Sequence, residues 1–247
     1  MSGTGGTWLI LGASSAMARA LTRKVAEAGA AVFVAGRDAA DLEAIAGDCR
    51  LRGAAEAAAL AFDARDPSGY EAIRRTLEGR EGPLNIAVFV GSMPPQEEID
   101  ADPLLIEGVI ADSFAGPATL LTLLAPLVEA SGGTVVGVGS VAGDRGRIGN
   151  YVYGAAKAGF HTYMSGLRNR LTRAGAHAVT VKPGFVDTAM TWGLPGLFLV
   201  APPEKVADDI LSAVRKRRDV IYTPFFWRYI MLIIRSVPER IFKKLSV

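Results

Sequence analysis

The stretch WLILGASSAMARAL, residues Trp8–Leu21, runs from an apolar segment through a glycine turn into a helical pattern. A strand that ends in such a turn and enters a helix begins a βαβ unit, and this turn often binds nucleotide phosphates. Ala16 and Ala18 occupy positions where a loop of the G-x-x-x-G-x-G kind carries glycine. The stretch predicts an α/β fold and raises the question of whether its turn still binds a cofactor.

The alternation of short apolar runs and longer helical patterns continues along the chain. Most apolar runs show no alternation with polar residues, which is typical of parallel strands covered on both faces. Joined by helices, such strands predict one doubly wound parallel α/β sheet of about seven strands, with helices on both faces and right-handed crossovers. The predicted strands are Thr7–Leu11, Ala31–Ala35, Ala57–Phe62, Asn85–Val90, Thr134–Gly139, Ala178–Lys182 and Val220–Tyr222, with helices near Ala16–Ala28, Ala40–Arg52, Pro67–Glu78, Pro103–Ala130, Val152–Arg173 and Pro203–Lys216.

Length and composition fit one domain of this kind. With 247 residues, half of them apolar, the chain can bury a substantial core. We expect residues 1–224 to form the domain, including a substrate loop at 185–202, and residues 225–247 to form an apolar and basic helical tail. The net charge of +2, without a basic run that contains interleaved aromatics, argues against nucleic acid as a partner.

Cysteine and histidine are scarce. Cys49 is the only cysteine, and His161 and His177 are the only histidines, so the sequence predicts neither a disulfide framework nor a metal site. The first residues enter a strand without a basic and apolar leader, which leads us to expect a cytoplasmic protein.

The strongest chemical signal lies in GSVAGDRGRIGNYVYGAAK, residues Gly139–Lys157. Tyr153 and Lys157 are four residues apart on one face of a predicted helix, and Ser140 ends the preceding strand. A lysine beside a phenol lowers its pKa from about 10 toward neutrality, so that the tyrosine can exchange a proton with a carbonyl/alcohol pair. Tyr151, the competing tyrosine, is expected to point away. A bare Y-x-x-x-K is common by chance, whereas its combination with a strand-end serine and a nucleotide-type turn is specific.

Together these motifs resemble the short-chain dehydrogenase/reductase family over nearly the whole chain. The resemblance implies a Rossmann fold, a nicotinamide cofactor, and hydride transfer to or from a carbonyl carbon. It further implies that Tyr153 is the acid/base, that Lys157 activates it and binds the ribose, and that Ser140 binds the substrate oxygen. The motifs that carry it are Gly12-Ala-Ser-Ser-Ala-Met-Ala18, Asp63, Gly91, Ser140, Tyr153-x-x-x-Lys157 and Pro183-Gly184.

With this resemblance the opening turn is interpreted as a cofactor loop rather than a plain connection. Gly12 is kept for the tight turn, while each alanine adds one methyl group and keeps helical backbone angles accessible. Ser14 and Ser15 can donate to a phosphate or cap the helix whose N-terminus faces it. The resemblance also places Asp63 at the adenine, Gly184 and Val186 beside the nicotinamide, and Thr188 near its carboxamide. The remaining expected cofactor contacts are Ala16, Met17, Gly91 and Pro183.

Two positions depart from the family pattern. The chain has Val88-Phe-Val-Gly91 where the family often carries Asn-Asn-Ala-Gly. Ser113 aligns with the asparagine that usually holds a proton-relay water, and a serine has a shorter reach and a single donor. We keep Ser113 as a candidate catalytic residue, and we interpret the neighbouring Asp112 as a surface charge rather than a substitute polar group.

The residues after the second strand favour NADPH over NADH. Enzymes that use NAD typically place a carboxylate there for the ribose 2′-hydroxyl, and this chain has Gly36 followed by Arg37. A small residue leaves room for a 2′-phosphate, with which arginine can pair bidentately. The competing interpretation makes Arg37 a solvated surface charge and Asp38 a helix cap. NADPH in turn favours reduction as the physiological direction.

The substrate loop and the tail bear on the substrate and on partners. The segment TWGLPGLFLVAPP, residues 191–203, is apolar and free of acids and bases, which suits a hydrophobic or lipid-linked carbonyl compound. The tail pattern, with Arg-Tyr-Ile-Met and then Val-Pro-x-x-Ile-Phe-x-Lys-Leu, resembles the decaprenylphosphoryl-2-keto-ribose reductases, which reduce a keto-pentose on a polyprenyl phosphate. The tail suits equally a subunit contact in a homodimer or homotetramer and the inner face of an anionic membrane.

A rival interpretation from another functional class is a non-catalytic protein that binds NADPH as a sensor or scaffold. The altered glycine loop and Ser113 favour it, and the intact set of Ser140, Tyr153 and Lys157 opposes it.

Overall fold

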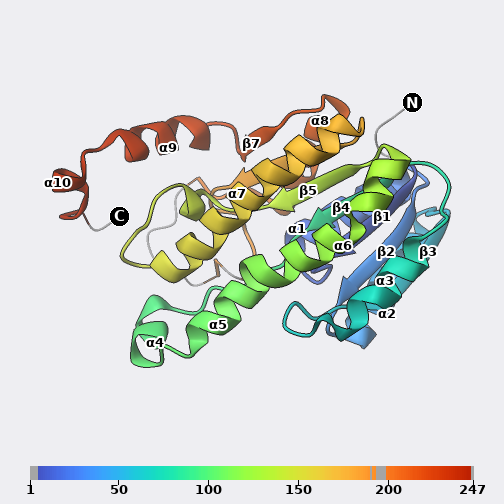
Figure 1. The fold of residues 1–247 in the computed structure, drawn as a ribbon, viewed down its shortest axis with the longest axis horizontal. Coiled ribbons are helices and arrows are strands. Elements are labelled where there is room, and N and C mark those ends of the chain that lie inside the picture. Colours follow the sequence, from blue (N-terminus) through green and yellow to red (C-terminus); the bar gives the residue numbers. More distant parts are fainter. Residues whose placement is uncertain (1–4, 190, 193–198, 246–247) are drawn as a thin grey trace.

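The fold is the seven-stranded parallel sheet that the sequence predicts, and its strands lie in the order β3-β2-β1-β4-β5-β6-β7. In this computed structural model, residues 5–189, 191–192 and 199–245 are described (Figure 1). The strand order reverses between β1 and β4, which is where a doubly wound sheet opens a binding crevice. The strands are β1 (Thr7–Leu11), β2 (Ala31–Gly36), β3 (Glu56–Ala61), β4 (Leu84–Val88), β5 (Thr134–Val138), β6 (His177–Pro183) and β7 (Val220–Thr223).

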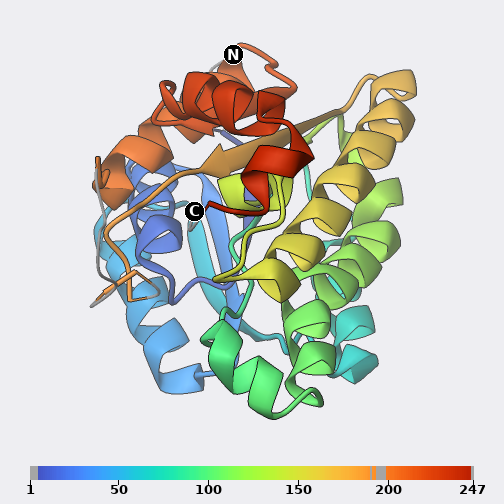
Figure 2. The same cartoon turned by 90° about the vertical axis from the view of Figure 1, so that its left-hand side faces the viewer.

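Helices cover both faces of the sheet, as Figure 2 shows in a view across the layers. On one face, α1, α2 and α8 bury side chains such as Leu21, Ile45 and Ile210 against the strands. On the other face, α3, α6 and α7 bury side chains such as Ile73 and Leu124. The helices are α1 (Ala16–Glu27), α2 (Ala39–Leu51), α3 (Tyr70–Leu77), α4 (Gln96–Ala101), α5 (Leu105–Ile110), α6 (Gly116–Ser131), α7 (Tyr151–Arg173), α8 (Pro203–Arg215), α9 (Trp227–Ser236) and α10 (Glu239–Phe242), with short turns η1 (Pro67–Gly69), η2 (Ala111–Ala115) and η3 (Val141–Asp144).

The middle helix contains a π-helical turn. Helices α5 and α6 join through η2 into one continuous helix over Leu105–Ser131, where the sequence predicts a regular helix. Among the described residues this is the one helix that is long and apolar enough to cross a membrane. Leu120 and Leu124 are fully buried in the core, so its apolar character is accounted for by packing against the sheet.

Two regions differ from the sequence-based expectation. Helix α4 is not predicted, because Gln96–Ala101 makes fewer than two turns and has no long apolar period; it is anchored by buried Gln96 and Ile99. The substrate loop is described in part, since residues 190 and 193–198 lie outside the described residues. Its two ends meet in a parallel bridge between Val186 and Ala201.

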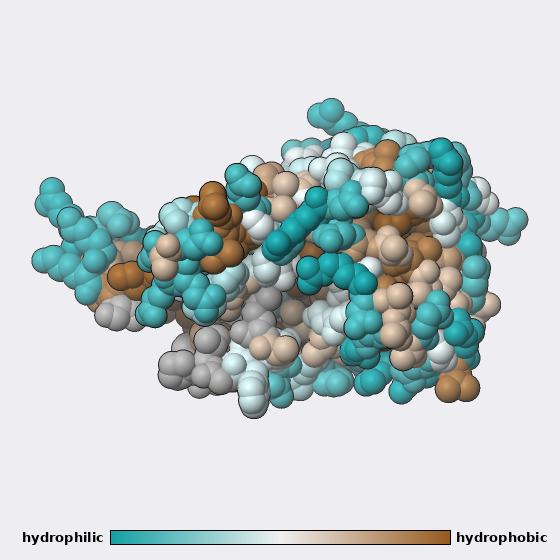
Figure 3. Space-filling view, turned by 90° about the horizontal axis from the view of Figure 1, so that it is seen from below, coloured by the Kyte–Doolittle hydropathy of each residue, from teal (hydrophilic) through white to brown (hydrophobic). Residues whose placement is uncertain are grey.

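The C-terminal tail consists of two helices rather than one. Helix α9 ends at Ser236, and α10 begins after Pro238, whose ring cannot continue the preceding helix. In the space-filling view the end of the chain projects from the body at the left as a mostly hydrophilic lobe (Figure 3). The start of the tail is buried instead, since Trp227 and Met231 pack against Val141.

Candidate active site

Three neighbouring cavities follow the edge of the sheet where its strands end. The first, of about 370 Å³, lies between the start of α1 and the start of α7. The second, of about 300 Å³, extends from it toward β2 and β3, and the third, of about 130 Å³, extends toward β6. Of the predicted site residues, the first cavity is lined by Ser14, Ser15, Ala16, Met17, Gly91, Tyr153, Lys157 and Thr188. The second cavity is lined by Gly12, Ser14, Ser15, Arg37, Asp63 and Gly91. The third cavity is lined by Met17, Ser140, Tyr153, Pro183, Gly184, Val186 and Thr188. Ser113 is the one predicted residue that lines none of them.

The turn after β1 requires glycine at its first position. Gly12 has a φ of +74°, and a Cβ atom there would lie 3.1 Å from the backbone carbonyl carbon of Phe89. Its amide donates to the carbonyl of Ala35 at 2.9 Å, which ties the turn to β2. The later alanines fit, because Ala18 is fully buried in helical geometry and Ala16 lines the first cavity.

The start of α1 is arranged as an anion site. Ser15 occupies the N-cap position, but its hydroxyl makes no capping hydrogen bond, and the first turn contains no acidic residue. The free amides of the first turn therefore face the first cavity without a competing carboxylate. This arrangement favours binding of a phosphate group.

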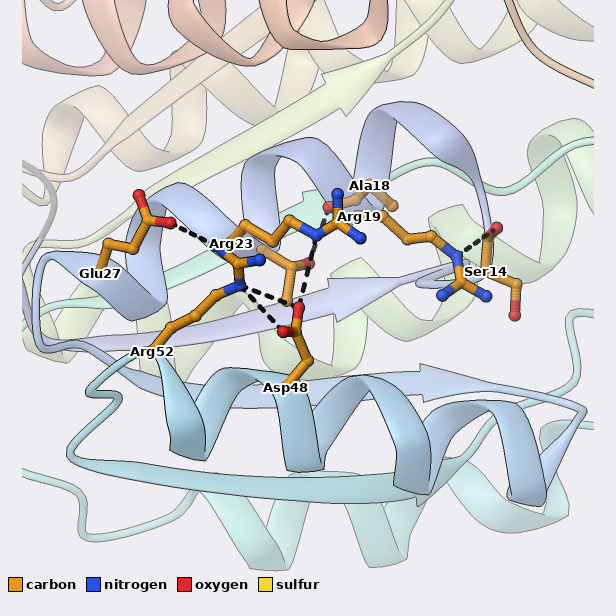
Figure 4. A network of polar contacts seen from close by, with 8 residues as sticks. Ser14, Ala18, Arg19, Arg23, Glu27, Asp48 and Arg52 are labelled. Atoms are coloured by element: carbon orange, nitrogen blue, oxygen red, sulfur yellow. Dashed lines mark hydrogen bonds and ion pairs between the residues drawn. The ribbon is translucent and has the colours of Figure 1, made fainter.

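Ion pairs hold α1 against α2 (Figure 4). Asp48 of α2 accepts hydrogen bonds from Arg23 at 3.4 Å and from Arg52 at 3.0 Å, and Arg52 also reaches Glu27 at 2.5 Å. Near the turn, Arg19 donates to the carbonyl oxygen of Ser14 at 3.3 Å. These contacts fix the direction of α1 and hence the position of its N-terminus.

Ser140 and Tyr153 meet at the border of the first and third cavities. The Oγ atom of Ser140 accepts a hydrogen bond from the amide of Ala142 at 3.1 Å. Burial raises the pKa of Tyr153 to about 12, against the opposing effect of its hydrogen bond with Ser140. The expectation of a lowered tyrosine pKa is therefore wrong for the protein alone, since desolvation outweighs the hydrogen bond with Ser140. The phenol is protonated at neutral pH.

Lys157 binds backbone oxygens rather than the phenol. Its Nζ atom donates to the carbonyl oxygens of Val90 at 3.1 Å and Val138 at 3.3 Å, and it lies 5.8 Å from the centre of the Tyr153 ring. Burial lowers the pKa of Lys157 to about 8. The ammonium group thus sits at the wall of the first cavity, charged below about pH 8.

Ser113 lies on the π-helical turn η2, close to the other site residues. Its Oγ atom accepts from the amide of Ser92 at 3.3 Å and can donate to the carbonyl of Ser92 at 3.4 Å. A Cβ atom on Gly91 would lie 3.0 Å from Lys157 Nζ and 3.2 Å from Ser113 Oγ. Glycine at position 91 therefore lets the lysine and the serine approach the same point, and π-turns are frequent at functional sites.

Asp112 is not a surface charge, contrary to the sequence-based interpretation. It is buried, and Arg65 donates to its two carboxylate oxygens at 2.9 and 2.7 Å. Burial raises its pKa, but the hydrogen bonds from Arg65 and Ser92 outweigh this and hold it below the usual range. The pair fixes the wall of the second cavity, which Asp112 lines.

Arg37 lines the second cavity and is available to pair with a ligand there. Arg37 is exposed and forms no ion pair with any described residue. The carboxylate of Asp38 accepts from the amide of Asp41 at 3.1 Å and caps α2, while Asp63 accepts from the amide of Arg65 at 2.9 Å. A ligand in this cavity therefore meets a guanidinium group at position 37, next to the carboxylate that caps α2.

The sequence analysis missed a buried polar network behind Ser140. The amide of Ser140 donates to His161 Nε2 at 3.3 Å, and His161 Nδ1 lies 3.6 Å from Asp144. Asp144 also accepts from Lys182 at 2.5 Å and from Tyr222 at 2.6 Å. Burial and then Lys182 lower the pKa of His161 to about 3, so the ring is neutral and can accept from Ser140. The spacing of residues 153, 157 and 161 along one helix face is the signal that could have found it.

The tail closes the side of the third cavity. A Cβ atom on Gly184 would lie 1.9 Å from Nε1 of Trp227, so the indole packs directly on that glycine. Arg145 donates to the carbonyl oxygens of Ile234 and Val237, each at 2.6 Å, and pairs with Glu239 at 2.9 Å. These hydrogen bonds attach the tail to the segment that follows β5.

Known proteins share this arrangement. The family profile described as short chain dehydrogenase matches residues 7–195. An uncharacterized oxidoreductase of Mycobacterium tuberculosis is 31% identical over 239 residues, which cover 96% of each chain. Ketoacyl reductase HetN of Nostoc sp. is 27% identical over 221 residues, which cover 87% of this chain and 77% of that protein.

A solved structure extends the similarity to the fold. The short-chain dehydrogenase from Sphingobium yanoikuyae, in complex with NADPH, is 25% identical with a TM-score of 0.75, and the alignment covers 95% of this chain and 97% of that chain. With a sheet in this strand order, a glycine turn after β1 and a family profile that spans most of the sequence, the chain belongs to the short-chain dehydrogenase family.

Proposed function

We propose that this oxidoreductase uses NADPH to reduce a ketone, with Tyr153 as proton donor. The observation that carries the proposal is the protonated, buried Tyr153 in hydrogen-bond contact with Ser140, where the first and third cavities meet. A nicotinamide held where the first and third cavities meet would supply the hydride. Ser140 holds the carbonyl oxygen by a hydrogen bond, and Tyr153 donates the proton that this oxygen needs as the alcohol forms.

The residues present fit such a cofactor. The tight turn at Gly12 packs against the chain after β4 and lines the second cavity, and the open N-terminus of α1 suits the pyrophosphate. Lys157 faces the first cavity with a charged ammonium group suited to ribose hydroxyls. Gly184, Val186 and Thr188 would border the nicotinamide ring and its carboxamide where the first cavity meets the third.

The second cavity supports NADPH rather than NADH. Arg37 forms no ion pair with a described residue, although its charge acts on Asp112 across the cavity, and Gly36 adds no side chain. Asp38, the nearest candidate for a ribose hydroxyl, accepts from the backbone of α2. A 2′-phosphate supplies the partner that Arg37 lacks.

The substrate is proposed to be a carbonyl compound with a hydrophobic part. Met93, Val141 and Phe185 line the third cavity, and the apolar substrate loop continues from its edge. A keto-sugar carried on a polyprenyl phosphate is a specific candidate. Another hydrophobic ketone is its alternative.

The outer face of the tail is exposed in the described part of the chain and is proposed to bind an anionic membrane surface. Phe225, Leu232 and Ile233 are exposed there, and the tail adds five exposed basic residues. Apolar and basic side chains on one helical segment suit an interface of this kind. A second copy of the chain, in a homodimer or homotetramer, is the alternative occupant.

The rival function, a non-catalytic NADPH sensor or scaffold, is favoured by one observation. Lys157 donates hydrogen bonds to the carbonyl oxygens of Val90 and Val138 rather than to the hydroxyl of Tyr153. The sensor predicts NADPH binding without any turnover.

The Tyr153→Phe variant tests the catalytic proposal. It removes the proton donor while keeping the ring, so turnover of a ketone is expected to fall by roughly 10²- to 10⁴-fold. NADPH binding, measured by quenching of tryptophan fluorescence, is expected to stay within a factor of a few. Tyr151→Phe is the matched control, since Tyr151 is half-exposed and bonds Asp100 outside the cavities. Equal turnover in wild type and Tyr153→Phe would exclude Tyr153 as the donor.

A further inference from the structure

The third cavity contains two buried polar atoms without a protein partner. These are Nε of Arg147 and Oδ1 of Asn150, and neither has a hydrogen bond to any described residue. Both residues line the cavity together with Ser140 and Tyr153. Buried polar groups are nearly always hydrogen-bonded. Two buried atoms without a hydrogen bond in one cavity therefore point to a ligand that binds them.

The guanidinium group of Arg147 has no carboxylate partner. None of its nitrogens forms an ion pair with a described residue, and its Nη2 atom lies 3.9 Å from the sulfur of Met231. Asp144 is the nearest negative charge that acts on it, and Lys182 and Tyr222 already occupy that carboxylate. Burial lowers the pKa of Arg147, although the group stays charged at neutral pH.

This charge is held in place by the fold. The backbone amide of Asn150 donates to the backbone carbonyl of Arg147 at 3.2 Å. One turn just before α7 therefore carries both side chains. Met231 comes from the tail, which Arg145 ties to the same turn. Burying a cation without a counter-ion costs free energy of folding. A bound ligand that supplies the anion would recover this free energy as binding affinity.

We propose that Arg147 and Asn150 form an oxyanion-binding subsite, and that the substrate therefore carries a carboxylate or phosphate group close to the carbonyl that is reduced. The inference rests on the proposed function for the position of that carbonyl between Ser140 and Tyr153. Arg147 pairs with the anionic group, and Asn150 hydrogen-bonds one of its oxygens or an adjacent hydroxyl. This subsite requires a negatively charged group on the substrate, in addition to the hydrophobic part that the third cavity accepts.

Matched pairs of small ketones test the subsite by binding. Dihydroxyacetone phosphate is compared with dihydroxyacetone, and acetoacetate with methyl acetoacetate, so that the two pairs distinguish phosphate from carboxylate. Calorimetric titrations are made with the free protein and with NADP⁺ present, since NADP⁺ supplies no hydride to a ketone. Binding of NADP⁺ is measured first, so that a failure of the cofactor proposal is seen separately.

In the wild type, the charged member of at least one pair is expected to bind about 30-fold more tightly than its neutral partner. Arg147→Gln is expected to remove this preference while NADP⁺ binding stays unchanged. Arg173→Gln, which alters an exposed arginine at the end of α7, is the control and is expected to keep it.

A second variant keeps the test valid if Arg147→Gln fails to fold. Asn150→Asp retains a favoured N-cap residue and therefore preserves α7, but it places a negative charge in the cavity. It is expected to abolish the preference for the charged ligand. The proposal is overturned if the wild type shows no charge preference in either pair, or if Arg147→Gln or Asn150→Asp binds the charged ligand as tightly as the wild type does. A loss of stability without any change in charge preference would make Arg147 a packing residue only.

Discussion

The cofactor side and the substrate side of this site are built in different ways. On the cofactor side, many contacts come from short turns that directly follow one strand, as at Gly12 after β1 and Arg37 after β2. On the substrate side, Arg147 meets Met231 although the two residues are 84 positions apart in the sequence. The comparison teaches that a dinucleotide site can be carried by local motifs, whereas a specificity pocket depends on distant segments and on a tail that closes over them.

The largest expected effect that separates the two sides comes from Trp227→Ala. The indole is buried on Gly184, and its removal leaves a cavity that is expected to cost about 3–5 kcal/mol in the free energy of unfolding. Ketone binding should weaken, while the affinity for NADPH should be retained at temperatures where the variant is folded. Chemical denaturation and fluorescence titration measure the two quantities.

Trp192→Ala is the control for this change. Trp192 is 87% exposed, so its removal is expected to change the unfolding free energy by less than about 0.5 kcal/mol. If Trp227→Ala lowered the affinity for NADPH as much as that for the ketone, the two sides would not be separable.

A smaller effect is expected from pH, and it belongs to the cofactor side. Lys157 has a pKa lowered by burial to about 8, so it is charged below that pH and loses its charge as the pH rises through it. Tyr153, with a pKa raised to about 12, stays protonated over the same range. NADPH affinity and the rate of ketone reduction are therefore expected to fall above about pH 8. A Lys157→Met variant should show a low, pH-independent affinity, and an unchanged pH profile in that variant would assign the titration to another group.

The smallest expected effect concerns the outer face of the tail. A double variant, Leu232→Ser with Ile233→Ser, changes two exposed side chains and leaves buried Trp227 and Met231 in place. Co-sedimentation with vesicles rich in phosphatidylglycerol should weaken by roughly 30-fold or more, because each of the two exposed side chains contributes about 1 kcal/mol or more on burial. A loss of the oligomer in light scattering, with vesicle binding unchanged, would assign the face to a subunit contact instead.

The sequence predicted the sheet well because its strands are short, apolar and uninterrupted. Each predicted strand coincides with an observed one to within two residues at either end. The π-turn at Ala111–Ala115 and the short helix α4 were missed, since neither has a period that a sequence pattern reveals. Asp112 was misread for a related reason: its partner Arg65 is 47 residues away and follows a different strand.

The candidate site was predictable where residue type and strand ends decide it. Fifteen of its positions line the cavities, from Gly12 to Thr188, because the carboxyl ends of parallel strands meet at one edge. The raised pKa of Tyr153 was not predictable, since it depends on how completely α7 and its neighbours exclude water. The contacts of His161 and Arg147 were also hidden, because they form only once the segment after β5 packs on α7 and the tail.

The central claim, an NADPH-dependent reductase, is tested most directly by titrating the protein with NADPH and NADH and following tryptophan fluorescence. We predict that NADPH binds at least about 10-fold more tightly than NADH, and that Arg37→Ala removes most of this difference, because a charge-assisted pair to a phosphate contributes about 1.5–3 kcal/mol. Equal binding of the two cofactors in the wild type would contradict the role of Arg37. Binding of neither would show that the turn at Gly12 does not hold a dinucleotide.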